Sequence, residues 1–180
     1  MIRILTPDDA AAFQALRLRG LRESPAAFGS TYENEVDTPL EQIAERLVRG
    51  AGREDVMFGA FDDDGGALVG LAGLARQNGP KSRHRAGVWG MYVAPEARGR
   101  GAGRALISAL IAHARTLDGV ERLVLGVESG NKAARALYHS FGFATYGIEP
   151  EAYKLNGKYW DSEMMSLSLK KTAQPYTELR

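Results

Sequence analysis

The chain has 180 residues and a formal net charge of +1, and 44% of its residues are hydrophobic and 25% charged. These values predict one folded domain with a sizeable core, and they exclude the strong positive charge that attracts nucleic acid or a membrane surface. Because the chain has no cysteine, disulfides, thiolate metal ligands and a cysteine nucleophile are excluded. The N-terminal residues do not resemble a signal peptide and no apolar run approaches the roughly 18 residues of a membrane span, so we expect a cytoplasmic protein.

The first part of the chain predicts one short strand and two helices. Residues 2–5 are mostly apolar and fit a strand. The run Thr-Pro-Asp-Asp then supplies a cap, a proline at the first helical position and an acid near the third, so a helix is expected over 6–22. The same signal predicts a second helix over 38–49. The intervening residues 24–37 are expected to be irregular.

The middle of the chain predicts three strands. Residues 56–61 and 67–75 are apolar, and the run Asp-Asp-Asp-Gly-Gly between them predicts a hairpin turn over 62–66. A basic loop over 78–85 then leads into a third apolar run over 87–93.

A glycine-rich turn over 98–103 reads Arg-Gly-Arg-Gly-Ala-Gly and separates that strand from an amphipathic helix over 104–117. A strand, a glycine turn and a helix start aim free N–H groups and the positive end of the helix at one point, which is typical of a phosphate site. A side chain at Gly101 or Gly103 would keep a diphosphate from touching the backbone. The string matches neither the P-loop nor the dinucleotide fingerprint, and a plain turn with solvated arginines is the alternative.

A second cluster follows about thirty residues later. Residues 123–127 predict a short buried strand, and Asn131 then caps a helix that ends at Gly142. Asn131 and Tyr138 are seven residues apart, so they share one helix face two turns apart.

Together the two clusters resemble the GNAT superfamily of acyl-CoA-dependent N-acetyltransferases. The first signature of that family is Q/R-x-x-G-x-G/A, which is met here by Arg98, Gly101 and Gly103. The second is N-x-x-A-x-x-x-Y-x-x-x-G-F, which is met here by Asn131, Ala134, Tyr138, Gly142 and Phe143. The resemblance is strong from about residue 86 to residue 143.

The C-terminal part predicts two more strands. The first covers 143–155 with an interruption near Pro150, and Asn156-Gly157 is a hairpin signal before the last strand, over 159–169. We expect a single domain over 1–170 and a polar tail over 171–180. The element order β-α-α-β-β-β-α-β-α-β-β predicts an α/β fold. The resemblance implies a mixed, mostly antiparallel sheet that is splayed at its centre and has helices on both faces.

The resemblance also implies acetyl-CoA as the acyl donor, with no metal. It implies that the coenzyme is bound by Met91, Tyr92, Val93, Arg98, Gly99, Arg100, Gly101, Ala102, Gly103, Arg104, Asn131 and Tyr138. Tyr138 is the expected acid near the leaving sulfur. A phenol with a pKa near 10 is a weaker acid than a thiol near 8.5, so a hydrogen bond to the developing thiolate is the safer expectation than full proton transfer.

The general base is less well defined. The two positions at which the family usually carries a glutamate hold Gly87 and Gly126 here. Glu128 is the candidate, since it lies two residues beyond Gly126 on the same strand face, but a solvated carboxylate at a strand end is an equal interpretation. The other interpretations are a water chain without a dedicated base, or Glu33, Glu35 or His84.

We expect the amine acceptor to meet residues 28–35, the hairpin over 147–160 and a strand aromatic, with the contacts made by Phe28, Tyr32, Glu33 and Trp89. The acceptor could be a small amine or amino acid, an antibiotic or a peptide N-terminus. The acidic residues within 28–35 favour a cationic amine. The expected function is transfer of an acetyl group to a primary amine in a ternary complex. The alternatives are a catalytically weak acyl-CoA sensor and an enzyme that uses succinyl-CoA. An edge strand near the C-terminus would allow a homodimer.

Overall fold

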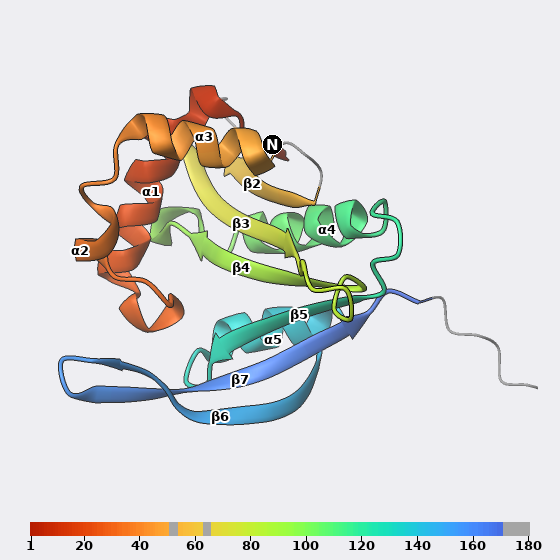
Figure 1. Cartoon of the computed structure of the whole chain (residues 1–180). Helices are drawn as coiled ribbons and strands as arrows, with labels where there is room; N and C mark the ends of the chain where they lie inside the picture. Colours follow the sequence, from red (N-terminus) through yellow and green to blue (C-terminus); the bar gives the residue numbers. More distant parts are fainter. Residues whose placement is uncertain (51–53, 63–65, 171–180) are drawn as a thin grey trace, which may run out of the picture.

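The structure is a computed structural model that describes residues 1–50, 54–62 and 66–170. Its described strands form one sheet in the order β1-β2-β3-β4-β5-β7-β6 (Figure 1). The strands are β1 (Ile2–Ile4), β2 (Asp55–Phe61), β3 (Leu68–Arg76), β4 (Arg85–Val93), β5 (Arg122–Glu128), β6 (Ala144–Leu155) and β7 (Lys158–Ser168). The helices are α1 (Ala10–Glu23), α2 (Tyr32–Glu35), α3 (Leu40–Gly50), α4 (Ala102–Ala114) and α5 (Lys132–Ser140), with the 3-10 turns η1 (Pro7–Asp9), η2 (Pro25–Ala27) and η3 (Pro95–Ala97).

The sheet is open at its centre. Among the described strands, β4 and β5 are the only parallel neighbours, and they pair only where residues 85–87 face residues 122–124. Beyond Gly87 the two strands separate, so their C-terminal ends diverge (Figure 1). All other neighbouring strands are antiparallel. The mixed, mostly antiparallel and centrally splayed sheet that the resemblance implies is therefore confirmed.

Helices cover both faces of the sheet, as expected. The alternation of strand side chains assigns each face. On β2, Val56 and Phe58 pack into the core beneath α4, whereas Met57 packs into a second core with α1 and α3. The α5 residue Tyr138 belongs to the same core as α4. The α4 and α5 helices thus share one face, and α1 and α3 share the other.

A β-bulge in β4 changes which side chains face each layer. The β3–β4 register shifts between Leu71 and Gly73, opposite Gly90, whose φ of +62° lies in the left-handed region that favours glycine. Before the bulge, Val88 faces the α4 core. After it, Met91 faces that core and Tyr92 faces α1. Without the extra residue, residues 88, 90 and 92 would all share one face.

Residues 24–37 correct one expectation. They are not irregular throughout, because they contain η2 and α2. The Thr31 side chain accepts a hydrogen bond from Asn34 N (3.4 Å) at the start of α2. Gln14 Nε2 donates to Glu35 O at the end of α2, at 2.8 Å. A four-residue helix is too short to show a periodicity, so the sequence pattern did not reveal it.

Other element boundaries differ little from expectation. The glycine-turn helix begins at Ala102 rather than residue 104 and ends at Ala114 rather than residue 117. Strand β6 is irregular between Glu149 and Tyr153, as Pro150 predicts. The Asn156-Gly157 turn has φ values of +50° and +78°, so the predicted hairpin is confirmed. Part of the 62–66 turn and the tail over 171–180 lie outside the described residues. In the described part of the chain, no helix is both long and apolar enough to cross a membrane.

Candidate active site

A groove of about 570 Å³ opens where β4 and β5 separate, between the N-terminal ends of α4 and α5. It brings together eleven of the twelve residues expected to bind the coenzyme, namely Met91, Tyr92, Val93, Arg98, Gly99, Gly101, Ala102, Gly103, Arg104, Asn131 and Tyr138. The twelfth, Arg100, instead borders a neighbouring hollow beside β1. The two sequence clusters therefore meet in space although they are about thirty residues apart in the chain.

The glycine turn presents free backbone donors to this groove. Among the backbone hydrogen bonds of the described residues, none is donated by the N–H groups of residues 99–104. Gly99 and Gly101 have φ values of +76° and +86°, which is why glycine is required at both. The first turn of α4 adds its own unpaired N–H groups and the positive end of its dipole. The turn therefore has the chemistry of an anion site.

Crowding within the protein gives a further physical reason for glycine at position 103. A Cβ on Gly103 would lie 3.3 Å from Leu137 Cδ2 and 3.5 Å from Met91 Cε. This glycine therefore allows α4 to lie close to α5 and β4. A Cβ on Gly101 would meet nothing within 4 Å, so there the backbone conformation, and not crowding within the protein, selects glycine.

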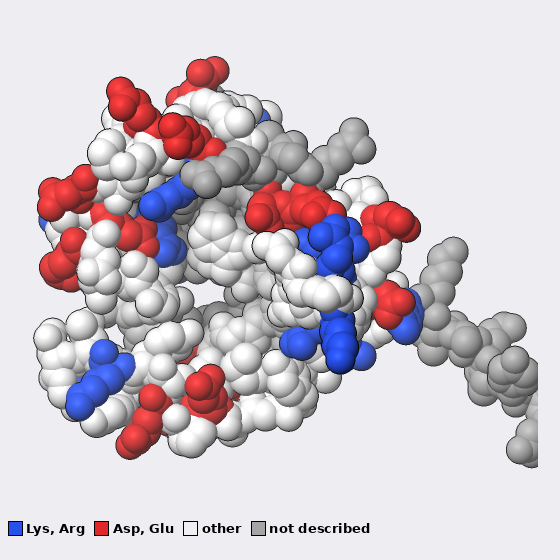
Figure 2. Space-filling model, viewed as in Figure 1, with Lys and Arg blue, Asp and Glu red and all other residues white. Residues whose placement is uncertain are grey.

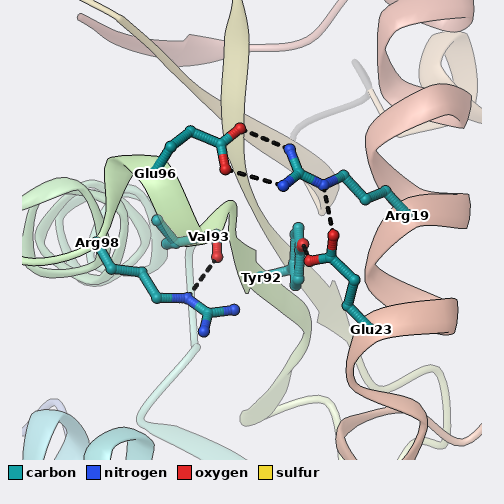
Figure 3. A network of polar contacts seen from close by, with 6 residues as sticks. All are labelled: Arg19, Glu23, Tyr92, Val93, Glu96 and Arg98. Atoms are coloured by element: carbon teal, nitrogen blue, oxygen red, sulfur yellow. Dashed lines mark hydrogen bonds and ion pairs between the residues drawn. The ribbon is translucent and has the colours of Figure 1, made fainter.

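Arg98 is held against the separated end of β4. Its Nε donates to Val93 O at 2.9 Å, and its guanidinium lies 5.9 Å from the centre of the Tyr92 ring (Figure 3). One lone pair of the Val93 carbonyl is thus already used, which leaves the other for a ligand in the groove.

A polar network ties α1 to the approach to the glycine turn (Figure 3). The Tyr92 hydroxyl donates to Glu23 Oε2 at 2.5 Å, and Arg19 joins Glu23 to Glu96 with contacts of 2.5 to 2.9 Å. Burial, followed by the hydrogen bond to Glu23, raises the pKa of Tyr92 to about 12. Hydrogen bonds from Arg19 lower the pKa of Glu96 to about 2. The residues involved are up to 77 positions apart, so the sequence carried no local signal of this network.

Tyr138 lies in the groove with its ring buried and its hydroxyl unpaired. The residue is 5% exposed, and its ring meets the Phe143 ring edge-on at 5.7 Å. The hydroxyl has no hydrogen-bond partner among the described residues. Burial raises the pKa of Tyr138 to about 12, so the phenol is protonated at neutral pH. Asn131, two turns away, accepts a hydrogen bond from Ala134 N at 3.1 Å as the cap of α5, which leaves its amide N–H₂ for a ligand.

Residues 21–143 match the family model described as the acetyltransferase (GNAT) family, which spans more than half of the chain. The chain belongs to this family. Both signature motifs, from Arg98 to Phe143, fall within the matched residues.

This GNAT chain is 39% identical over 85 residues to the L-methionine sulfoximine/L-methionine sulfone acetyltransferase of Salmonella typhimurium. That match covers 47% of this chain and 49% of the relative, so the chain spans about half the length of the curated relatives it matches. The ribosomal-protein-alanine N-acetyltransferase of Brucella melitensis has a similar structure, with a TM-score of 0.81, 29% identity and coverage of 94% and 99% of the two chains. The fold also matches yncA of Salmonella typhimurium with its cofactor acetyl-CoA, with a TM-score of 0.82, 24% identity and coverage of 98% of each chain.

Glu128 of this GNAT chain lies on the opposite face of β5 from Tyr138. Leu125 and Val127 face the α4–α5 core, so Glu128 points to the other layer. Its Oε1 accepts from Gly130 N at 2.9 Å, and the residue is half-buried and does not line the groove. His84, another candidate base, lies beside the paired ends of β4 and β5, where its carbonyl accepts from Glu121 N and Arg122 N.

The structure separates the four residues that were expected to meet the acceptor. Phe28 is buried and packs against Tyr92 with ring centres 6.3 Å apart. Tyr32 lies beneath the Arg22 guanidinium, which is 3.8 Å from its ring centre, and Glu33 is exposed. Tyr32 borders a hollow beside α1, whereas Trp89 lines a separate cavity. Gly73 makes room for the Trp89 indole, because a Cβ there would lie 2.5 Å from the ring.

That cavity has a volume of about 380 Å³ and lies on the α1–α3 side of the sheet. It is lined by Phe13, Arg17, Glu35, Arg46, Leu47, Asp55, Val56, Met57, Ala75 and Trp89. On this face the molecule is hollowed between its N-terminal half and the β6–β7 hairpin, with basic and acidic side chains along the upper rim (Figure 2). The two segments that were expected to shape the acceptor site lie close together at Gly29, where a Cβ would lie 3.6 Å from Tyr153 Cε1.

Proposed function

We propose that this GNAT chain is an N-acetyltransferase that transfers an acetyl group from acetyl-CoA to a primary amine in a ternary complex. The observation that carries the proposal is the groove between the separated strands. Free N–H groups of residues 99–104 lie at one part of it, and the unpaired hydroxyl of Tyr138 lies at another. The first suits the diphosphate of a coenzyme, and the second suits a sulfur atom that gains negative charge.

The reaction needs a neutral amine. An alkylamine with a pKa near 10.4 is mostly protonated at pH 7, and removal of its proton costs about 4–5 kcal/mol. The neutral nitrogen attacks the thioester carbon, the C–S bond breaks, and coenzyme A leaves as its thiolate. We propose Glu128 as the base, with a water molecule carrying the proton, because Glu128 faces the layer opposite the coenzyme groove. The Oε2 atom of Glu128 accepts no hydrogen bond from the described residues.

Tyr138 acts on the leaving sulfur as a hydrogen-bond donor. With its pKa near 12 and a thiol near 8.5, full proton transfer would be uphill by about 5 kcal/mol. A hydrogen bond requires no such transfer, and it is strengthened because the ring is buried. The phenol therefore stabilises the thiolate without losing its proton.

The proposed binding roles are divided along the groove. The N–H groups of residues 99–104 bind the diphosphate with Arg98 and Arg104 beside them. The backbone of residues 91–93 and the amide of Asn131 bind the pantetheine arm. Arg100 reaches the coenzyme from the rim. The same geometry also suits the alternative function, a sensor that binds acetyl-CoA without turnover.

The test is the release of coenzyme A from acetyl-CoA over a panel of amines, monitored with a thiol reagent. An enzyme releases coenzyme A in proportion to an acceptor, and mass spectrometry then detects the N-acetylated product. Saturable acetyl-CoA binding by calorimetry without release for any amine would favour the sensor. The absence of both binding and release would contradict both functions.

We further propose a cytoplasmic location and a homodimer formed through the edge of β6, where the large apolar residues Tyr146 and Ile148 are exposed. Light scattering on Ile148→Lys tests the dimer. A wild-type mass twice that of this variant is expected, and a monomeric wild type would contradict the proposal.

A further inference from the structure

Arg17 has one part of its guanidinium bound and another part free. It is 9% exposed, and its Nε and Nη2 donate to the two carboxylate oxygens of Glu35 at 2.9 and 2.7 Å. The guanidinium also lies 4.7 Å from the centre of the Phe28 ring. Nη1 has no hydrogen-bond partner among the described residues. This atom is also not fully buried, so a ligand in the cavity that Arg17 lines can reach it. A rigidly held, buried arginine thus offers two unused N–H groups.

Those N–H groups lie at the β4 bulge. Nη1 lies 3.6 Å from the position that a Cβ on Gly90 would occupy. Gly90 stands between Trp89, which lines the Arg17 cavity, and Met91, which lines the coenzyme groove on the other face of the strand. The free N–H groups of Arg17 therefore lie beside Gly90. The residue before Gly90 lines one cavity and the residue after it lines the other.

The charged groups of the cavity favour an anion over a cation. Burial raises the pKa of Glu35, but hydrogen bonds from Arg17 and Ser30 outweigh it and hold that pKa below its usual value. Glu35 is therefore ionised, with both oxygens occupied. Asp55 accepts from Arg76 N through one oxygen, at 3.1 Å. Arg46 is exposed at the edge of the cavity and attracts the Glu35 carboxylate electrostatically, but its N–H groups make no hydrogen bond within the described residues. Unused donors thus outnumber free carboxylates.

The remaining wall of the cavity is apolar. It consists of Phe13, Leu47, Val56, Met57, Ala75 and Trp89. A volume of about 380 Å³ lies at the lower end of the range for small-molecule sites. In an α-amino acid, the amine nitrogen lies about 2.5 Å from the carboxyl carbon, so a carboxylate held at the bulge keeps the amine within reach of the groove.

We propose that the acceptor is an α-amino acid with an apolar side chain, and that Arg17 binds its α-carboxylate. This inference rests on the proposed acetyl transfer. The side chain fills the cavity beside Trp89, and the amine points past Gly90 to the thioester. The nitrogen gains the acetyl group and loses one proton to the base, and the coenzyme leaves as its thiolate. This assignment replaces the cationic amine that the acids of residues 28–35 favoured.

The first test compares four acceptors with acetyl-CoA, namely L-leucine, L-leucinamide, spermidine and a tripeptide that begins with leucine. We expect kcat/KM to be at least tenfold higher for leucine than for leucinamide, because only leucine carries the α-carboxylate. Equal values for the two, or a preference for spermidine or the tripeptide, would overturn the role of Arg17 while leaving acetyl transfer standing. No coenzyme A release with any of the four would count against the proposed function itself.

The second test uses variants of the Arg17 pair. Arg17→Met alone would leave the Glu35 charge buried and unpaired, so the main variant is the double change Arg17→Met, Glu35→Gln. We expect it to lower kcat/KM for leucine roughly 10- to 100-fold, the size of a charge-assisted hydrogen bond, and to leave that for leucinamide within about threefold. Arg17→Lys should restore part of the preference. Arg22→Met is the matched control, because Arg22 lies on α1 outside this cavity.

An equal loss for both substrates in the double variant would mean that Arg17 only holds α2 in place, and would overturn the proposal. If circular dichroism shows that the double variant does not fold, Arg17→Lys provides the test. The quantity compared with wild type is then the ratio of kcat/KM for leucine to kcat/KM for leucinamide. An unchanged ratio there overturns the assignment, and a reduced ratio supports it.

Discussion

Gly101 provides the sharpest test of the diphosphate site. A Cβ at this position points into open space, yet the residue lines the groove with a φ of +86°. Gly101→Glu would place a flexible carboxylate at the mouth of the N–H cluster. Any non-glycine residue there also bears a backbone cost of about 1–2 kcal/mol. The matched variant Gly101→Gln has the same cost and nearly the same size without the charge.

The difference between the two variants isolates electrostatics. A carboxylate about 6 Å from a diphosphate charge repels it by about 1–3 kcal/mol at an effective dielectric constant of 20 to 40. We therefore expect the Kd of acetyl-CoA to be roughly 10- to 100-fold weaker for Gly101→Glu than for Gly101→Gln at low ionic strength. The difference should shrink in 0.5 M salt, because screening weakens the repulsion between exposed charges.

The assay is isothermal titration calorimetry of acetyl-CoA, with circular dichroism melts to verify that both variants fold. Equal affinities for Glu and Gln in folded variants would mean that no diphosphate lies near residue 101. The reasoning from the free N–H groups would then be wrong, even if the protein binds acetyl-CoA elsewhere.

Three further predictions concern other residues. Tyr138→Phe should lower kcat roughly 10- to 1,000-fold with less than a threefold change in acetyl-CoA Kd, and wild-type turnover would return Tyr138 to a packing role. Glu128→Gln should lower kcat/KM, whereas a wild-type kcat/KM in this variant would exclude Glu128 as the base. Hydrogen bonds from Arg3 lower the pKa of Asp9 to about 2 in the folded protein. The ionised carboxylate therefore stabilises the fold at pH values above the unfolded-state pKa near 3.9. This stabilisation is lost as the pH falls toward 2. Urea unfolding of Asp9→Asn should thus show a loss of about 1–2 kcal/mol at pH 7 that shrinks between pH 4 and pH 2, and a pH-independent loss would contradict this origin.

Local patterns predicted most of the secondary structure, and the family resemblance implied most of the residues that line the groove between β4 and β5. The cap at Asn131, the left-handed glycines at 99 and 101 and the turn at 156–157 each act over a few residues, so their signals stand in the sequence itself. The α2 helix was missed because it is held mainly by distant partners. Gln14 and Arg17 of α1 bond Glu35 across 21 and 18 residues, and no spacing rule reports such contacts.

The acceptor side of the site was hardest to predict, because the bulge at Gly90 changes the face of the sheet to which the β4 side chains point. Strict alternation would place Trp89, Met91 and Val93 on one face of β4. The extra residue instead leaves Trp89 on the α1–α3 face and moves Met91 and Val93 to the α4–α5 face. Residues on either side of Gly90 in one strand therefore line different cavities, Trp89 the α1–α3 cavity and Met91 the groove. Two reactants bound on opposite faces of a closed sheet could not meet, but here β5 has already separated from β4 before the bulge. Both features are thus needed for the two reactants to meet. The separation of β4 and β5 opens a passage through the sheet, and the bulge turns neighbouring side chains of β4 toward opposite faces.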